Sequence, residues 1–262
     1  ENNPDLIIIT KNEKYLPFEQ ILNFFGDTHF TVCYFENWFN LTSNIKTLNF
    51  GNYKLVNIWG NSQSLILLFI KELLDKLLAF ILIIILLPFL GVIALSISIT
   101  TKNYFLYKQN RVGKDGKIFK IYKFKTMKVS ESGEGAKLVQ AKKNDKRITA
   151  IGSFLRSYSL DELPQIFNVL NGTMSFVGPR PHAVTHNSYY RKKIIGYMQR
   201  HKTKPGITGL AQVNDFRGET KNLEDMQNRI NADLEYINNW SIFLDLKILF
   251  KTLFKFNSKS AY

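Results

Sequence analysis

The sequence predicts an α/β fold that carries a membrane-associated helix. Three observations support this class: short strand patterns alternate with a helix pattern near the N-terminus, an uncharged apolar run follows, and strand and helix patterns are mixed after it. We expect a partial N-terminal α/β module at residues 1–62, the membrane helix at 63–101 and a small mixed α/β domain at 102–262.

The composition indicates a packed protein with an anionic partner. The chain has 262 residues, 45% of them hydrophobic, and a formal net charge of +14. Phospholipid head groups, phosphorylated substrates and nucleic acid are all anionic. The sequence shows no RNP-like motif, zinc-finger spacing or heptad zipper, so we expect no nucleic acid partner. Cys33 is the single cysteine, which excludes an intrachain disulfide and a cysteine-based zinc site.

The N-terminal part predicts three short strands and one helix. The strand patterns are apolar and cover Leu6–Thr10, Phe30–Phe35 and Tyr53–Ile58. A helix pattern at Phe18–Phe25 ends at a glycine. These elements make a thin core for an independent domain. Since the chain begins with Glu1 rather than Met, we expect the tail of a larger regulatory module whose upstream part is absent.

The apolar segment Leu77–Thr101 carries no charged residue and is long enough to cross a bilayer, which needs ~20 apolar residues. Pro88 lies near its middle, where a proline removes a hydrogen bond and kinks a helix. Two interpretations remain open: a kinked transmembrane helix, and a helix that dips into the membrane and returns to the same face. Both predict membrane association.

A strongly basic segment follows the apolar helix. Residues 102–160 contain fifteen Lys or Arg and four acidic residues, and by the positive-inside tendency this side of the membrane is cytoplasmic. A glycine-rich turn at Gly113–Gly116, followed by alternation over Ile118–Phe124, predicts a β-hairpin. Residues 130–147 are polar and lysine-rich, which favours a mobile loop.

Two adjacent carboxylates, Asp161 and Glu162, are the strongest candidate site. Taken alone they are typical of helix capping, because Ser159 and Glu162 have the spacing of a capping box and Asp161 could itself cap a helix. The arginines on either side, Arg156 and Arg180, favour a reacting centre instead. A carboxylate that meets an anionic phosphate needs cations nearby to hold that phosphate, and a metal ion serves the same end.

The last predicted helix, Asn239–Phe256, is amphipathic. Trp240 and Phe243 belong to a broad apolar side, which Lys247 and Lys251 interrupt. Such a helix can lie in the membrane interface, with lysines among the head groups. It can equally close the core of the preceding domain, and the sequence leaves both interpretations open.

Five blocks of the sequence, in order, resemble the bacterial sugar transferase family, the monotopic phosphoglycosyltransferases that load a sugar phosphate onto a polyprenyl phosphate. The blocks are the apolar helix after KELLDKLL, QNRVGKDGKIFKIYKFKTM, SLDELPQIFNVLNGTMSFVGPRP, KPGITGLAQVN and DLEYINNWSIFLDLKILFKT, and the resemblance covers residues 65–262. Within the family, HAVTHNSYYRKKIIGYMQRHKTKPGITG, FRGET and SAY are most similar to the undecaprenyl-phosphate glucose phosphotransferases of exopolysaccharide synthesis.

The resemblance implies an enzyme with covalent chemistry. In the family the aspartate attacks the β-phosphorus of a UDP-sugar, forms a phosphosugar-aspartate intermediate and releases UMP, and the polyprenyl phosphate then accepts the sugar phosphate. Asp161 would be that nucleophile, and Glu162 with Asp161 would bind Mg²⁺. The expected function is transfer of glucose 1-phosphate from UDP-glucose to undecaprenyl phosphate, the first membrane step of exopolysaccharide or glycan assembly. The rivals are the same reaction with galactose or an N-acetylhexosamine, and a non-catalytic basic membrane scaffold.

The resemblance also implies phosphate-binding roles for four basic residues, namely Arg156, Arg180, Lys204 and Lys123. It places four structural residues around them, which are Pro179, Pro181, Pro205 and Gly206. Three positions depart from the family pattern: Lys204 stands where many relatives have Arg, Leu210 where they often have Trp, and Asp215 where the close subfamily tends to have Gly. The choice of sugar therefore stays open.

For the membrane helix, the resemblance favours dipping over spanning. Family members carry a re-entrant helix broken at a proline, here Pro88, with both ends in the cytoplasm. We therefore expect the catalytic domain on the cytoplasmic face of the bacterial inner membrane, with a homo-oligomer left open.

Overall fold

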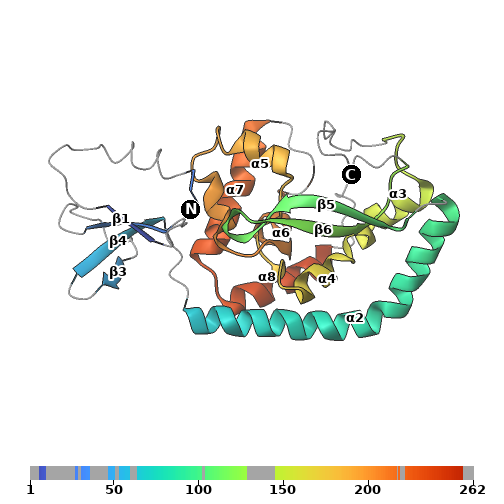
Figure 1. Cartoon of the computed structure of the whole chain (residues 1–262), viewed down its shortest axis with the longest axis horizontal. Helices are drawn as coiled ribbons and strands as arrows, with labels where there is room; N and C mark the ends of the chain where they lie inside the picture. Colours follow the sequence, from blue (N-terminus) through green and yellow to red (C-terminus); the bar gives the residue numbers. More distant parts are fainter. Residues whose placement is uncertain are drawn as a thin grey trace.

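The computed structural model describes residues 6–9, 27–28, 31–35, 47–50, 53–59, 64–101, 104–128, 145–216, 218 and 222–255. Helices and strands are mixed throughout, which confirms the predicted class. Figure 1 shows a small sheet at one end, a mixed α/β body beside it, and one long helix running along that body.

The N-terminal sheet has four strands, in the order β1-β2-β4-β3. They are β1 (Leu6–Ile9), β2 (Thr31–Phe35), β3 (Thr47–Phe50) and β4 (Tyr53–Trp59). β1 and β2 are parallel, and the other pairs are antiparallel. Three strands were predicted and are present. β3 was missed because two of its four residues are polar, whereas β1, of the same length, is entirely apolar. The helix predicted at 18–25 and most of the loop predicted at 130–147 lie outside the described residues.

Helix α2 (Leu65–Thr101) is one continuous helix that includes Pro88. Its most apolar window of 18 residues has a mean hydropathy of 3.1, and only 17% of that window is buried, so α2 is long and apolar enough to cross a membrane. It begins before the predicted apolar segment, because charges four residues apart pair along its first turns, as Lys76 does with Glu72 at 2.8 Å. Figure 1 shows α2 bending in its later part, as expected of a proline-containing helix.

After α2 comes the predicted hairpin. Strands β5 (Leu106–Val112) and β6 (Ile118–Phe124) are antiparallel and are joined by a tight turn, η2 (Lys114–Gly116). The remaining elements are α3 (Ala150–Ser157), η3 (Leu160–Glu162), α4 (Gln165–Leu170), β7 (Ser175–Val177), α5 (Val184–Tyr190), η4 (Tyr197–Lys202), β8 (Gly206–Thr208), α6 (Leu210–Val213), α7 (Leu223–Asn238) and α8 (Ile242–Lys255). β7 and β8 pair in parallel.

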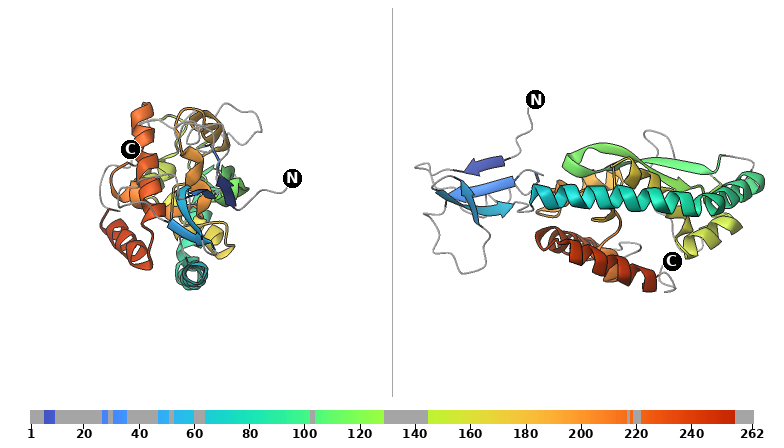
Figure 2. Two further views of the ribbon diagram at one scale, coloured as in Figure 1. Left: turned by 90° about the vertical axis from the view of Figure 1, so that its left-hand side faces the viewer. Right: turned by 90° about the horizontal axis from the view of Figure 1, so that it is seen from below.

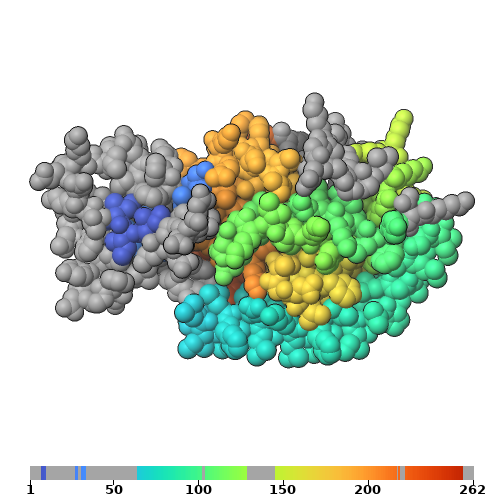
Figure 3. All heavy atoms as spheres, in the orientation of Figure 1, coloured from blue at the N-terminus to red at the C-terminus, as the bar shows by residue number. Residues whose placement is uncertain are grey.

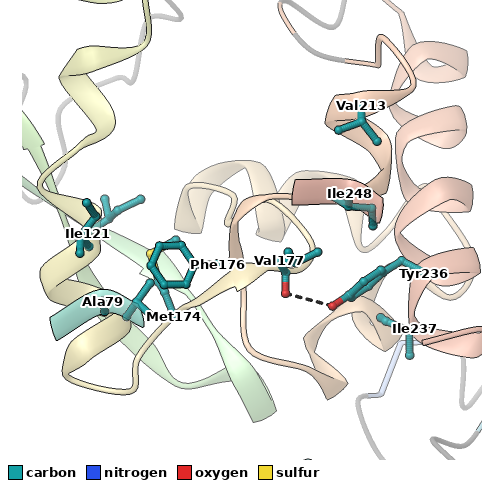
Figure 4. Packing of buried hydrophobic residues seen from close by; sticks show 11 residues of the cluster. Ala79, Ile121, Met174, Phe176, Val177, Val213, Tyr236, Ile237 and Ile248 are labelled. Carbon is teal, nitrogen blue, oxygen red and sulfur yellow. Dashed lines mark hydrogen bonds between the residues drawn. The ribbon is translucent and has the colours of Figure 1, made fainter. Parts of the chain in front are cut away.

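The main core lies between α2, α4, β7, α7 and α8, and Figure 4 shows part of it. Met174 and Phe176 pack on the side of Ala79, and the Tyr236 hydroxyl lies 3.0 Å from the carbonyl oxygen of Val177. Ile248 of α8 is 1% exposed in the same cluster. The interpretation of the last helix as a core element is therefore confirmed for one of its faces.

The other face of α8 is exposed and apolar. It carries Phe243, Leu246, Phe250, Leu253 and Phe254. Figure 2 shows α2 and α8 on the same side of the molecule, the lowest in Figure 1, and Figure 3 shows α2 forming the lower border of that view. Lys71 of α2 binds the carboxylate of Asp245 of α8, which fixes the two helices to each other.

Candidate active site

The two predicted carboxylates lie together on η3, a single 3₁₀ turn. Ser159, with a left-handed φ of 56°, starts the turn, and the amide of Glu162 donates to the carbonyl oxygen of Ser159 at 3.2 Å. Asp161 and Glu162 are each only 8% exposed. Pro164, not an acid, occupies the N-cap of α4. The interpretation of these acids as caps of the following helix is therefore wrong, and their burial needs another reason.

Glu162 is held by two cations from separate elements. Lys123 of β6 donates to Oε1 at 2.8 Å, and Arg180 donates through both terminal nitrogens, at 3.1 Å to Oε2 and 2.5 Å to Oε1. Burial by itself raises the pKa of Glu162, but Arg180 and Lys123 outweigh it and hold that pKa well below its usual value. Glu162 is therefore ionised at neutral pH.

Asp161 shows the opposite shift. Burial raises its pKa, Lys123 opposes that rise, and the neighbouring charge of Glu162 adds to it. One carboxylate of the pair is thus firmly ionised, while the other sits in surroundings that disfavour its negative charge. Such a carboxylate is a better nucleophile and base than an exposed aspartate once it is ionised.

Lys123 reaches Glu162 because α4 is fixed beside the hairpin. The side chain of Asn168 accepts from the amide of Tyr122 at 3.0 Å and donates to the carbonyl oxygen of Lys120 at 2.8 Å. These bonds replace a neighbouring strand at this edge of β6. η3 directly precedes α4, so the same contact sets the distance between Lys123 and Glu162.

Arg180 is placed by a close crossing of two backbones. Gly206 donates from its amide to the carbonyl oxygen of Pro179 at 3.0 Å. A Cβ at Gly206 would lie 2.1 Å from the amide nitrogen of Gly178, so only glycine fits. Pro205 accepts from the amide of Ser175 at 2.8 Å in the same crossing. The predicted structural residues of this loop thus hold the segment that carries Arg180.

Two other predicted phosphate-binding residues lie in different places. Arg156 of α3 donates from Nε to the hydroxyl of Thr126 at 2.9 Å, and its charge lowers the pKa of Asp161, which places it beside the acid pair. Lys204 instead binds Glu72 of α2 at 3.0 Å and lines a separate pocket with Trp240. The structure does not bring Lys204 to the acid pair.

The sequence analysis missed a buried network behind Arg180. Arg200 of η4 is 2% exposed; it pairs with Asp233 of α7 at 2.7 Å and donates to the carbonyl oxygen of Arg180 at 2.6 Å. It also contacts Nδ1 of His182 at 2.6 Å. No pattern around Arg200 distinguishes it from a surface arginine. Arg111, whose pKa the charge of Glu162 raises against the larger effect of burial, lies inside the QNRVG block and was overlooked there.

The two carboxylates are of the ligand type that magnesium prefers. In the described part of the chain no group of three or more His, Cys, Asp or Glu side chains gathers around a common point. Mg²⁺, however, is commonly bound by one or two carboxylates together with substrate phosphate oxygens. Asp161 and Glu162 supply that number, although Glu162 is engaged by Lys123 and Arg180.

The family model described as bacterial sugar transferase matches residues 66–259, which include all of α2 except Leu65 and every later element through α8. The chain belongs to this family. It is 50% identical over 240 residues to a UDP-glucose:undecaprenyl-phosphate glucose-1-phosphate transferase of Klebsiella pneumoniae, covering 90% of the chain and 51% of that relative. It is 52% identical over 189 residues to the protein of the same name in Escherichia coli K12, covering 72% and 40%.

A less similar relative carries another sugar in its name. It is a UDP-N-acetylgalactosamine-undecaprenyl-phosphate N-acetylgalactosaminephosphotransferase of Aeromonas hydrophila, 40% identical over 185 residues, or 71% of the chain and 43% of that relative. The chain spans about half the length, or less, of these three relatives.

Proposed function

We propose that the protein transfers glucose 1-phosphate from UDP-glucose to undecaprenyl phosphate, giving undecaprenyl-diphosphate-glucose and UMP. One observation carries the proposal: a buried Asp-Glu pair, held by Lys123 and Arg180, in a member of the bacterial sugar transferase family. The names of the relatives at 50% and 52% identity support glucose as the sugar and undecaprenyl phosphate as the acceptor.

Asp161 is the proposed nucleophile. Its carboxylate oxygen forms a bond to the β-phosphorus of UDP-glucose, the bond between that phosphorus and the bridging oxygen breaks, and UMP leaves with the electron pair. An oxygen of undecaprenyl phosphate then forms a bond to the same phosphorus, and the carboxylate of Asp161 leaves. Each step exchanges one P–O bond for another, so no oxidant or further reactant is needed. The covalent stage divides one displacement between two anions into two separate displacements.

The cations around Glu162 are proposed to hold the reacting phosphate. Arg180 presents a planar fork that matches two phosphate oxygens, and Lys123 adds a point charge. Because both already contact Glu162, they lie at the acid pair before substrate arrives. Arg156 adds a third positive charge on the side of Asp161.

A magnesium ion is proposed as the cofactor. Glu162 and Asp161 would hold it, and it would neutralise charge on the phosphate oxygens. The same role explains why the pKa of Glu162 is kept low, since a metal ligand must be ionised.

The membrane arrangement is also a proposal: α2 enters the bilayer, turns at Pro88 and returns to the cytoplasmic face. Three features support it: the proline inside α2, the exposed apolar face of α8 on the same side, and the bond from Lys71 to Asp245 that keeps the first turns of α2 on the catalytic domain. Undecaprenyl phosphate would then meet the acid pair at the membrane surface.

Cysteine accessibility tests this arrangement. With Cys33 replaced by Ser, single cysteines at Asp27→Cys and Tyr104→Cys flank α2 at exposed positions. In intact inner-membrane vesicles, a dipping helix makes both react with an impermeant maleimide from the cytoplasmic side. Reaction from opposite sides would show that α2 spans the membrane and would overturn the re-entrant proposal.

UMP release tests the reaction. The full chain, reconstituted in bilayer discs with undecaprenyl phosphate and Mg²⁺, is given UDP-glucose, UDP-galactose, UDP-N-acetylglucosamine and UDP-N-acetylgalactosamine. We expect release with UDP-glucose, lost on chelation and in Asp161→Asn but kept in Asp225→Asn, the same change on α7. UMP release with another UDP-sugar, and not with UDP-glucose, would identify that sugar as the one transferred. No release by folded protein with any sugar would favour the scaffold.

A further inference from the structure

A second group of cationic side chains lies beside the acid pair. The end of β5 runs along the loop after Arg180, because the amide of Val112 donates to the carbonyl oxygen of His182 at 3.4 Å. Arg111, the residue before it, donates to the carbonyl oxygen of Pro181 at 3.4 Å and to the side chain of Gln109 at 2.5 Å. Its guanidinium group is therefore fixed against the segment that carries Arg180.

One hydrogen-bond donor of Arg111 is unused. Its Nε atom is buried and has no hydrogen-bond acceptor in the described part of the chain. A buried donor without an acceptor is destabilising, because it has lost its hydrogen bond to water. The bonds to Pro181 and Gln109 already fix the position of the Arg111 guanidinium, so the burial of Nε without an acceptor is not needed to hold the side chain in place.

A second unused donor, Nε2 of His182, lies on the adjoining segment. Arginine can only donate, so the contact from Arg200 at 2.6 Å makes Nδ1 of His182 the acceptor and leaves the proton on Nε2. His182 is 5% exposed, and among the described residues Nε2 has no partner. Among the described residues, two buried donors on adjoining segments thus lack acceptors, and an anion bound there would accept from both.

The surrounding charge selects an anion. Arg229 of α7 donates to the carbonyl oxygens of Phe216 and Gly218 at 2.9 and 3.0 Å, so its position is fixed as well. Burial, together with the positive charge of Arg180, lowers the pKa of Arg111 to about 10. The nearby acids Glu162 and Asp233 already pair with Arg180 and Arg200. Positive charge remains in excess here.

We propose that Arg111 and His182 form a second phosphate subsite beside the acid pair, with Arg229 adding charge. The inference rests on the proposed function, in which two phosphates separate, one bound to Asp161 and one leaving on UMP. The leaving phosphate gains charge as the P–O bond breaks, so it needs cations that Glu162 does not occupy. A phosphate monoester also terminates the polyprenyl acceptor, and the experiment separates these two sources.

Binding of UMP, measured by titration calorimetry on the full chain in bilayer discs, tests the subsite without turnover. Arg111→Gln removes the charge and is expected to weaken UMP binding at least tenfold, whereas Arg191→Gln, an exposed arginine paired with Asp27, leaves it unchanged. A parallel titration with a short-chain polyprenyl phosphate is expected to be unaffected in both variants. Loss in the polyprenyl titration instead would assign the subsite to the acceptor.

Two changes at His182 give a finer test. His182→Asn keeps an acceptor for Arg200 but lacks the Nε2 donor, and it should weaken UMP binding several-fold. His182→Gln places an amide near Nε2 and should restore part of it. Wild-type affinity for both phosphates in folded Arg111→Gln and His182→Asn would overturn the subsite. That result would leave the proposed function standing, because UMP release by wild type tests it separately.

Discussion

Glu162 and Asp245 are both buried carboxylates with several hydrogen-bond donors, yet they sit in two very different regions. The donors to Glu162, Lys123 and Arg180, come from a hairpin and a loop, and the side chain of Arg180 is 27% exposed. Asp245 accepts from Lys71 and from the indole of Trp240 at 3.1 Å, and its other oxygen lies 2.8 Å from the Tyr236 hydroxyl.

The difference lies in what stands next to each carboxylate. Each has a second acid with a raised pKa nearby, which is Asp161 for Glu162 and Asp75 for Asp245. The charges of three cationic side chains, Lys123, Arg156 and Arg180, act on the first pair. The second pair meets Lys71 and two neutral donors, the Tyr236 hydroxyl and the Trp240 indole. A saturated buried carboxylate therefore does not by itself mark a reacting site. Several cations around an acid pair, one of them the partly exposed Arg180, are the feature that favours a phosphate site.

The largest expected effect separates the two carboxylates by activity. Glu162→Gln removes the charge that holds Lys123 and Arg180, and we expect UMP release to fall on the order of 10²-fold, as for loss of one charge-stabilising group. Asp245→Asn keeps an acceptor for its donors and should retain most turnover. An equal loss of UMP release in folded Asp245→Asn would contradict the distinction between the two carboxylates.

For Asp245 we expect a large effect on stability in place of an effect on activity. Asp245→Ala leaves the Lys71 ammonium group without its buried partner and should lower the free energy of unfolding by about 3 kcal/mol. The control is Asp27→Ala, whose side chain is 45% exposed and pairs with the 39% exposed Arg191, with an expected change below about 0.5 kcal/mol. Thermal unfolding in detergent measures both. Similar melting temperatures would show that the Asp245 network contributes little.

A smaller effect is expected at Arg200, a positioning residue that acts through the Arg180 loop. Arg200→Lys keeps the charge but cannot bind Asp233, His182 and the carbonyl oxygen of Arg180 together, so we expect kcat to fall about tenfold. KM for the UDP-sugar should change less. Arg191→Lys is the matched surface control. A fall in melting temperature with unchanged kcat would make Arg200 purely structural.

The smallest effect is a gain in stability at Asp161. Its folded-state pKa is raised, so its favourable contribution is complete below the unfolded pKa and is lost as pH rises through the folded pKa. Asp161→Asn should therefore raise the melting temperature at pH 7, although it abolishes turnover. The gain should disappear on acidification toward pH 3.8 and below. A variant that melts lower than wild type at pH 7 would contradict the raised pKa.

Local patterns in the sequence identified the elements that depend on short-range chemistry. The hairpin around Gly113–Gly116 and the apolar helix with Pro88 are present as predicted. The resemblance to a family placed Asp161 and Glu162 together with Arg180, and in the structure Lys123 and Arg180 both donate to Glu162. The adjacent positions of the two acids and the order of the sequence blocks were sufficient for these predictions.

Long-range placement was outside the reach of those patterns. Lys204 has the same charge as Lys123, but the pairing of β7 with β8 turns it toward Glu72 of α2. Arg200 is buried because Asp233 of α7, distant in sequence, meets it there. Neither fact has a signature in the neighbouring residues, since both depend on which elements pack together.

One short segment has a consequence for work with hybrid proteins. In η4, Gln199 donates to the carbonyl oxygen of Thr28 at 2.7 Å, while its neighbour Arg200 holds the Arg180 loop. Arg191, just before η4, pairs with Asp27 at 2.7 Å. Exchanging the N-terminal module with that of a relative therefore requires matching Arg191 and Gln199 to the incoming module. The contacts that such a chimera must preserve therefore include residues 191 and 199, far along the chain from the point where the two sequences are joined.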